Sequence, residues 1–285
     1  MRLIYYSFKR YLTMKTKYII LFTIFLTMAT VGTSSAVKAT ASKIKEDKVT
    51  YSVGDKVYQG FVYYDENVKG KRPAVLVVHE WWGLTDYPKM RAKKLAELGY
   101  IAMAVDMFGE GKVAANPTEA QELTKLFYQN PQLSKTVLEA AIAKLKEFKQ
   151  TNPKDIFAIG YCFGGSIVLN AAKLGSDLKG VVSFHGGLKG APADKDLLKA
   201  QILVCHGGND KFVSDNDLNT FKHQMDSIGA AYKVIIYPNA THAFTNPDAT
   251  AIGKKFNMPI EYNKKADHDS WKDMKMFFDK ILKKM

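Results

Sequence analysis

The sequence predicts an α/β fold in which a mostly parallel central sheet is covered by helices on both faces. Short apolar runs typical of strands alternate along the chain with longer stretches whose apolar residues recur at helical spacing. Several of the apolar runs are continuous, as expected for strands that are buried on both faces. Polar residues directly follow many of these runs, and the carboxyl ends of parallel strands meet at one edge of a sheet, where ligands bind.

The chain from residue 42 opens with a predicted β-hairpin. Val49–Val53 and Val57–Tyr64 have strand composition and flank the turn residues Gly54 and Asp55. The continuous apolar run Pro73–Val78 follows and predicts a buried parallel strand.

The remaining elements alternate between helix and strand. Helices are predicted over Pro88–Leu98, Pro117–Tyr128, Leu133–Lys149, Ser166–Leu174, Asp217–Ile228 and Asp267–Lys284. Strands are predicted over Tyr100–Val105, Asp155–Ile159, Gly180–Phe184, Gln201–Gly207 and Tyr232–Tyr237. No linker rich in proline, glycine or serine divides this part, so residues 42–285 are expected to form one domain.

Residues 1–41 resemble an N-terminal extension followed by a secretory signal peptide. Lys15 and Lys17 precede the apolar run 18–31, and the small residues 34–36 and 39–41 offer cleavage sites. Met14 is the expected start, which makes 1–13 an extension. The pattern predicts a secreted or periplasmic protein with no membrane span after cleavage, because threonines break the short run. A retained membrane span is the alternative.

Charge gives little reason to expect a nucleic-acid partner. The formal net charge is +13, and residues 1–41 contribute six basic residues and no acidic one. The remaining lysines are spread along the chain rather than clustered with aromatic residues, which favours a solvated surface.

The stretch from Gly160 to Gly165 has the G-x-C-x-G pattern of a nucleophile elbow, with Cys162 where serine is usual. It lies between a predicted strand and a predicted helix, which is the context that this turn requires. The glycines allow the strained backbone that presents the nucleophile. The pattern therefore predicts Cys162 as a nucleophile.

A thiol nucleophile needs a base, and the base needs a carboxylate to orient it. On this type of fold the chain order is nucleophile, acid, histidine. Cys162, Asp210 and His242 follow that order, each after a predicted strand. Asp215 and Asp217 are rival acids, although capping of the following helix is their simpler role.

Glu80 follows a buried strand and is expected to face the same site. A charge that stabilises a helix start is its simpler interpretation. His79 and Glu80 also suggest a metal, but the H-E-x-x-H motif fails because residue 83 is glycine. A metal would require His79, His185 and His206 to converge, so no metal is predicted.

Several motifs resemble those of the dienelactone hydrolase family. They are Val78-His79-Glu80-Trp81-Trp82-Gly83-Leu84, Asp106-Met107-Phe108-Gly109-Glu110-Gly111, Gly160-Tyr161-Cys162-Phe163-Gly164-Gly165 and Thr241-His242-Ala243-Phe244-Thr245, with Tyr262-Asn263 and Ser270-Trp271 near the C-terminus. The similarity covers most of residues 50–285. It implies an α/β-hydrolase fold, a Cys-His-Asp triad, and ester or lactone hydrolysis through an acyl-thioester.

The resemblance also implies roles around the nucleophile. The family glutamate at the position of Glu80 contacts the resting thiol, and the thiolate forms when substrate displaces it. The backbone N–H groups of Phe163 and Trp81 would form the oxyanion hole. Family members specific for dienelactone hold the substrate carboxylate with arginines, one of them four residues past the histidine. Here that residue is Asn246, and no arginine follows Arg91.

From the sequence we therefore expect an exported, cofactor-free hydrolase that acts on a small-molecule ester or lactone. Trp81, Trp82, Phe108 and Phe244 are the predicted pocket residues, together with Lys112, which would offer only a point charge. Core packing is an equal interpretation for Phe108. The alternative function is an envelope thiol protein with a redox or ligand-binding role, although C-x-x-C is absent.

Overall fold

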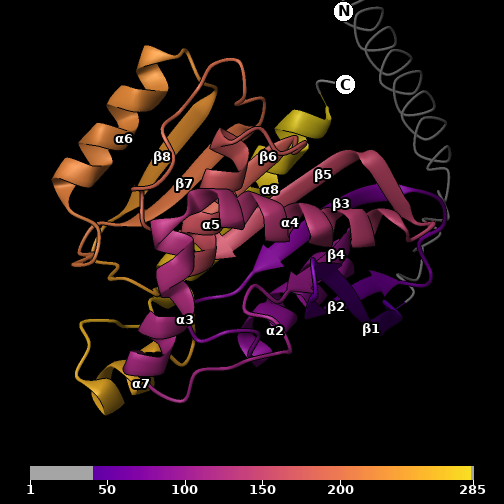
Figure 1. Cartoon of the computed structure of the whole chain (residues 1–285), viewed down its shortest axis with the longest axis horizontal. Coiled ribbons are helices and arrows are strands. Elements are labelled where there is room, and N and C mark those ends of the chain that lie inside the picture. The colour runs from indigo at the N-terminus through magenta and orange to yellow at the C-terminus, as the bar shows by residue number, and fades with distance from the viewer. Residues whose placement is uncertain (1–40, 284–285) are drawn as a thin grey trace, which may run out of the picture. The chain divides into compact units, whose positions relative to one another are not determined.

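The computed structural model describes residues 41–283 (Figure 1). From Ser42 onward the chain forms one compact unit. The predicted signal peptide falls in residues 1–41, and all but the last of these lie outside the described residues.

The described residues form one eight-stranded sheet in the order β1-β2-β4-β3-β5-β6-β7-β8. The strands are β1 (Ile44–Val53), β2 (Lys56–Asp65), β3 (Arg72–Val78), β4 (Ile101–Val105), β5 (Thr151–Tyr161), β6 (Gly180–Phe184), β7 (Gln201–Gly207) and β8 (Tyr232–Tyr237). Strands β1 and β2 form the predicted antiparallel hairpin, and β2 pairs with β4 in antiparallel orientation. All pairs from β4 to β8 are parallel, which confirms the predicted fold class.

Seven helices are described: α2 (Asp86–Glu97), α3 (Pro117–Gln129), α4 (Pro131–Lys146), α5 (Phe163–Lys173), α6 (Asp215–Ser227), α7 (Ala249–Phe256) and α8 (Lys264–Leu282). Helix α7, a short helix in the segment after His242, was not predicted from the sequence. Helix α8 begins earlier than predicted, because the side chain of Asn263 caps it by accepting the N–H of Ala266. Within residues 41–283, no helix has the length and apolar character needed to cross a membrane.

The sheet separates two apolar cores because successive side chains of a strand point to opposite faces. In β3, Leu76 and Val78 pack into one core, whereas Val75 and Val77 pack into the other. The first core contains side chains of α3, α4, α5 and α6, and the second contains side chains of α2 and α8. Figure 1 shows α4 and α5 across one face of the sheet and α8 beyond the other. Strand β5 is therefore covered on both sides, and its carboxyl end leads directly to Cys162.

Candidate active site

The backbone at Cys162 makes the sharp turn expected of a nucleophile elbow. Cys162 has φ 52° and ψ −113°, between the end of β5 and the start of α5. A side chain at Gly160 would place its Cβ 2.0 Å from the carbonyl oxygen of Gly164, and one at Gly164 would lie 2.4 Å from that of Val78. Glycine is required at both positions because strand, turn and helix approach so closely. The turn leaves the Cys162 side chain partly exposed.

A buried hydrogen-bond network holds this turn from behind. The N–H of Cys162 lies 3.0 Å from the carbonyl oxygen of Phe184 and 3.1 Å from Nδ1 of His185. Burial, together with the charges of His242 and Arg91, lowers the pKa of His185 well below its ordinary value, so its ring is neutral. Because Nδ1 accepts a hydrogen bond, the proton of the neutral ring is on Nε2.

The same network reaches the loop that carries His242. Nε2 of His185 donates to Oγ1 of Thr245 at 2.7 Å, and the hydroxyl of Tyr87 lies 2.7 Å from the same oxygen. Arg91 donates to the carbonyl oxygen of Thr245 at 2.6 Å and forms an ion pair with Asp267. This arrangement was not predicted from the sequence. The only signal for it was the polar character of the segments that follow the strands.

Asp210 and His242 form a directly hydrogen-bonded pair. Nδ1 of His242 lies 2.9 Å from Oδ2 of Asp210, while Oδ1 of Asp210 accepts the N–H of Phe212 at 2.8 Å. Burial alone would raise the pKa of Asp210, but the hydrogen bond and charge of His242 lower it below its ordinary value. Asp210 therefore stays ionised and orients the imidazole.

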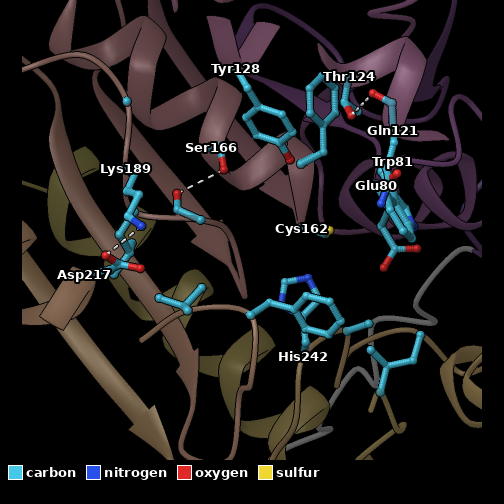
Figure 2. A pocket seen from close by; sticks show the side chains of 18 of the residues that line it. Glu80, Trp81, Gln121, Thr124, Tyr128, Cys162, Ser166, Lys189, Asp217 and His242 are labelled. Atoms are coloured by element: carbon cyan, nitrogen blue, oxygen red, sulfur yellow. Dashed lines mark hydrogen bonds and ion pairs between the residues drawn. The ribbon is translucent and has the colours of Figure 1, made fainter. Parts of the chain in front are cut away.

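His242 also adjoins the thiol of Cys162. Burial alone would lower the pKa of His242, but the charge of Cys162 and the hydrogen bond and charge of Asp210 raise it to about 10. The structure thus brings Cys162, Asp210 and His242 together from three separate strand ends. Figure 2 shows Cys162 and His242 facing each other across the cavity. The rival acid Asp217 instead makes a capping box with Ser214 at the start of α6.

Glu80 lies in the same cavity but has a different partner from the expected one. Its Oε2 accepts a hydrogen bond from Nδ2 of Asn246 at 2.6 Å, and both residues are buried. Among the described residues, no hydrogen bond joins Glu80 to Cys162, and the amide of Asn246 is the hydrogen-bond partner of the carboxyl group. Burial raises the pKa of Glu80 to about 7, although Asn246 and His242 oppose this shift. Glu80 can therefore change its charge near neutral pH.

The expected oxyanion groups occupy the two segments beside the thiol. Phe163 is the first residue of α5, and the N–H of a first helical residue has no intrahelical acceptor. The Phe163 ring is buried and packs against Phe127 at a centroid distance of 5.3 Å. Trp81 follows Glu80 and stacks edge-on against Trp82 at 5.0 Å. Both Phe163 and Trp81 line the cavity that contains Cys162.

This cavity has a volume of about 530 Å³ and a largely apolar wall. It is lined by Glu80, Trp81, Trp82, Gln121, Thr124, Tyr128, Cys162, Phe163, Ser166, Asn170, Gly187, Leu188, Lys189, Gly190, Phe212, Val213, Asp217, His242, Ala243, Met258 and Ile260. The positions of Trp81 and Trp82 agree with the sequence analysis. Tyr128, Phe212, Met258 and Ile260 could not be predicted, since they come from helices and loops far apart in the chain.

Three predicted pocket residues do not line the cavity. Phe108 is buried in the first core, where its ring lies 5.4 Å from that of Phe163, so core packing is the correct interpretation. Phe244 is buried in the second core against Tyr237, because the turn after His242 directs it under the sheet edge. Lys112 is half exposed and pairs with Glu110 at 3.2 Å.

The histidines do not converge on a metal site. Nδ1 of His79 contacts the carbonyl oxygen of Glu80, and Nε2 accepts the N–H of Met107 at 3.1 Å. His185 uses both ring nitrogens in the network described above. Within residues 41–283, no group of three or more histidine, cysteine, aspartate or glutamate side chains could hold a metal ion.

Comparisons with known proteins agree with this architecture. Residues 58–282 match the dienelactone hydrolase family. The chain is 29% identical to "Protein usf" of Aquifex pyrophilus, over 74% of this chain and 89% of the relative. It is 28% identical to "Putative carboxymethylenebutenolidase" of Aquifex aeolicus (strain VF5), over 77% of this chain and 93% of the relative.

A solved structure is similar over nearly the same region. It is the dienelactone hydrolase-like promiscuous phosphotriesterase P91 from metagenomic libraries, with 31% sequence identity and a TM-score of 0.79. The match covers 84% of this chain and 98% of that protein. With the family match spanning most of the chain and the fold in agreement, the protein belongs to the dienelactone hydrolase family, a family of α/β hydrolases.

Proposed function

We propose that this hydrolase cleaves a small ester or lactone through an acyl-thioester on Cys162. The observation that carries the proposal is the arrangement of Cys162 at a strained turn, beside His242, with Asp210 at 2.9 Å behind the imidazole. A thiol, a base and an orienting carboxylate in one cavity are the parts that nucleophilic acyl transfer requires.

In the proposed reaction, His242 takes the thiol proton while Sγ of Cys162 attacks the substrate carbonyl carbon. The N–H groups of Phe163 and Trp81 stabilise the resulting oxyanion. Collapse of the tetrahedral intermediate breaks the bond to the leaving oxygen, which receives the proton from His242. Water, deprotonated by His242, then attacks the thioester, and the acid departs as the thiol is restored.

The substrate is proposed to differ from dienelactone. The side chain four residues past His242 is Asn246, and it is engaged with Glu80 rather than with the cavity's open volume. Arg91 is 2% exposed and is paired with Asp267. Asn246 has no guanidinium group, and that of Arg91 is buried and paired, so neither residue can hold a substrate carboxylate in the cavity.

A panel of para-nitrophenyl esters, lactones and a neutral aryl phosphotriester tests the proposal, the last because of the activity that the name of P91 states. We expect turnover of at least one ester or lactone by the wild-type chain, and a loss of at least ~100-fold in the His242→Asn variant. Full activity in that variant would contradict the proposed base. Failure of the wild type to cleave any member would favour the alternative, an envelope thiol protein.

We also propose that the protein is exported. The support is the basic, apolar and small-residue order of positions 15–41. Intact-mass measurement of protein from its native host should give an N-terminus near residue 37, 40 or 42. Retention of Met1 or Met14 on the protein would contradict export with cleavage.

A further inference from the structure

From the lining of the active-site cavity, we infer that the substrate is an uncharged ester with an apolar acyl arm and that anionic esters are rejected. The inference rests on the proposed function, since it concerns what Cys162 attacks. The preference of the cavity for uncharged ligands can nevertheless be tested on its own, because binding can be measured without turnover.

The walls on either side of Cys162 favour apolar groups. Trp81, Trp82 and Tyr128 present aromatic surface, and Leu188, Met258 and Ile260 present aliphatic surface. An apolar group that enters such a cavity is removed from water and gains contacts with these side chains. The volume of about 530 Å³ lies in the ordinary range for small-molecule sites.

The cavity offers an anionic group no unpaired cation from the described part of the chain. Among the described residues that line it, Lys189 is the single lysine or arginine. Its Nζ lies 3.2 Å from Oδ1 of Asp217, whose side chain is only 13% exposed, whereas that of Lys189 is 83% exposed. Burial opposes the shift, but contacts with Ser214 and Lys189 lower the pKa of Asp217, so it stays ionised. The lysine charge is thus already paired with a carboxylate.

The other ionisable groups in the cavity do not attract an anion either. The charge of His242 is offset by Asp210, its hydrogen-bond partner at 2.9 Å. Glu80 contributes a carboxyl group of its own on the opposite side of Cys162 from Lys189 and Asp217 (Figure 2). A substrate carboxylate would therefore lose water and share the cavity with the Glu80 carboxyl group, which is unfavourable without an unpaired cation.

The test uses two esters that differ at one end of the acyl arm. In para-nitrophenyl hemisuccinate a carboxylate replaces the terminal methyl group of para-nitrophenyl butyrate, and the leaving group is the same. We expect kcat/KM for the butyrate to exceed that for the hemisuccinate by about 100-fold or more, after correction for their uncatalysed rates. Equal or faster cleavage of the hemisuccinate would overturn the inference.

A binding measurement separates this inference from the proposed function. Butyrophenone and benzoylpropionate differ in the same way and contain no cleavable ester. Butyrophenone should protect Cys162 from iodoacetamide at a concentration at least tenfold below that needed with benzoylpropionate. Equal protection, or better protection by benzoylpropionate, would contradict the inference whether or not any ester is cleaved. If the wild-type protein cleaves no ester but is still protected better by butyrophenone, only the proposed function would be contradicted.

Two matched variants test the role assigned to the ion pair. Asp217→Asn frees Lys189, whereas Asp215→Asn removes an equal charge from the same helix start without altering the cavity lining. Asp217→Asn should shift the ratio of hemisuccinate to butyrate kcat/KM toward the hemisuccinate by about tenfold, and Asp215→Asn by less than about twofold. Equal shifts in both variants would show that Asp217 does not neutralise Lys189.

Discussion

The two cysteines occupy contrasting positions in the same sheet. Cys205 lies inside β7, is fully buried, and accepts a hydrogen bond from the Tyr237 hydroxyl at 3.6 Å. Burial raises its pKa to about 12, which keeps it a neutral thiol at ordinary pH. Cys162 lies one residue past the end of β5, at φ 52°, partly exposed and beside His242. Both are free cysteines.

The difference shows that position along a strand decides what the same side chain does. Within β7 the pleat directs the thiol into the second core, where it packs as a small apolar group. Past the end of β5 the chain turns, and the thiol faces a cavity and a histidine. The following predictions test this contrast, from the largest expected effect to the smallest.

Replacing each cysteine with alanine should give the largest difference between the two positions in kcat. Cys162→Ala should reduce kcat for a cleaved ester by at least ~1000-fold, because the proposed thioester forms on Cys162 and no other thiol of the described residues lines the cavity. Cys205→Ala should retain kcat within about threefold. Steady-state rates on one ester measure both. Comparable losses in the two variants would remove the functional distinction between the cysteines.

Asp210→Asn should leave Cys162 in place but make His242 a weaker base. We expect kcat to fall by roughly 100-fold or more, because the asparagine no longer stabilises the imidazolium of His242. The pKa of His242 should fall below about 10, since the carboxylate of Asp210 is one cause of its elevation. Imidazole NMR and pH–rate profiles measure these effects. Asp215→Asn, in the exposed first turn of α6, is the matched control and should change neither.

Glu80→Gln should make the free Cys162 more reactive only at higher pH. The pKa of Glu80 is about 7, so the wild-type carboxyl group is neutral well below that pH and anionic above it. An anion in the cavity disfavours the thiolate by like-charge repulsion. The iodoacetamide rate of the variant should therefore exceed that of wild type by a few fold near pH ~8 and match it near pH ~6.

The control for that experiment is Asp248→Asn. Asp248 is a carboxylate that helps to raise the pKa of Glu80, but it does not line the cavity that contains Cys162. Cys205 is replaced by alanine in every protein, so that only Cys162 is labelled. Slower alkylation of the Glu80→Gln protein near pH ~8 would refute a restraining role for Glu80.

For the free energy of unfolding we expect the opposite order: replacing Cys205 should have the larger effect, although both effects are small. Cys205→Ala removes a buried sulfur from a packed core and should cost about 1–2 kcal/mol. Cys162→Ala keeps the same Cβ at a partly exposed turn and should change the free energy of unfolding by less than about 0.5 kcal/mol. Urea unfolding monitored by circular dichroism measures both. A larger loss for Cys162→Ala would show that the thiol helps to hold the turn.

Much of this contrast follows from local sequence. The apolar runs predicted the succession of strands and helices along the chain, apart from α7. The glycines around Cys162 predicted the turn because close backbone approach is a local requirement. Asp210 and His242 could be selected because the chain order of the three groups is fixed by the order of the strands.

Contacts between distant loops could not be predicted in this way. The pairing of Asn246 with Glu80 joins residues 166 positions apart, and the contact of His185 with Thr245 joins residues 60 positions apart. Such contacts depend on how loops pack after the sheet has formed. For the same reason, the predictions that Phe244 and the cation Lys112 line the cavity were wrong.

The most direct test of the central claim is to trap the acyl-enzyme on the wild-type chain. A slowly hydrolysed para-nitrophenyl ester is mixed with the protein, the reaction is quenched in acid during turnover, and peptides are mapped by mass spectrometry. We predict a mass increase equal to the acyl group on the peptide containing Cys162, absent from the Cys162→Ala protein, with the Cys205 peptide unmodified. Turnover with no acyl group on Cys162, or with the adduct on another residue that forms and decays at the rate of turnover, would contradict the account.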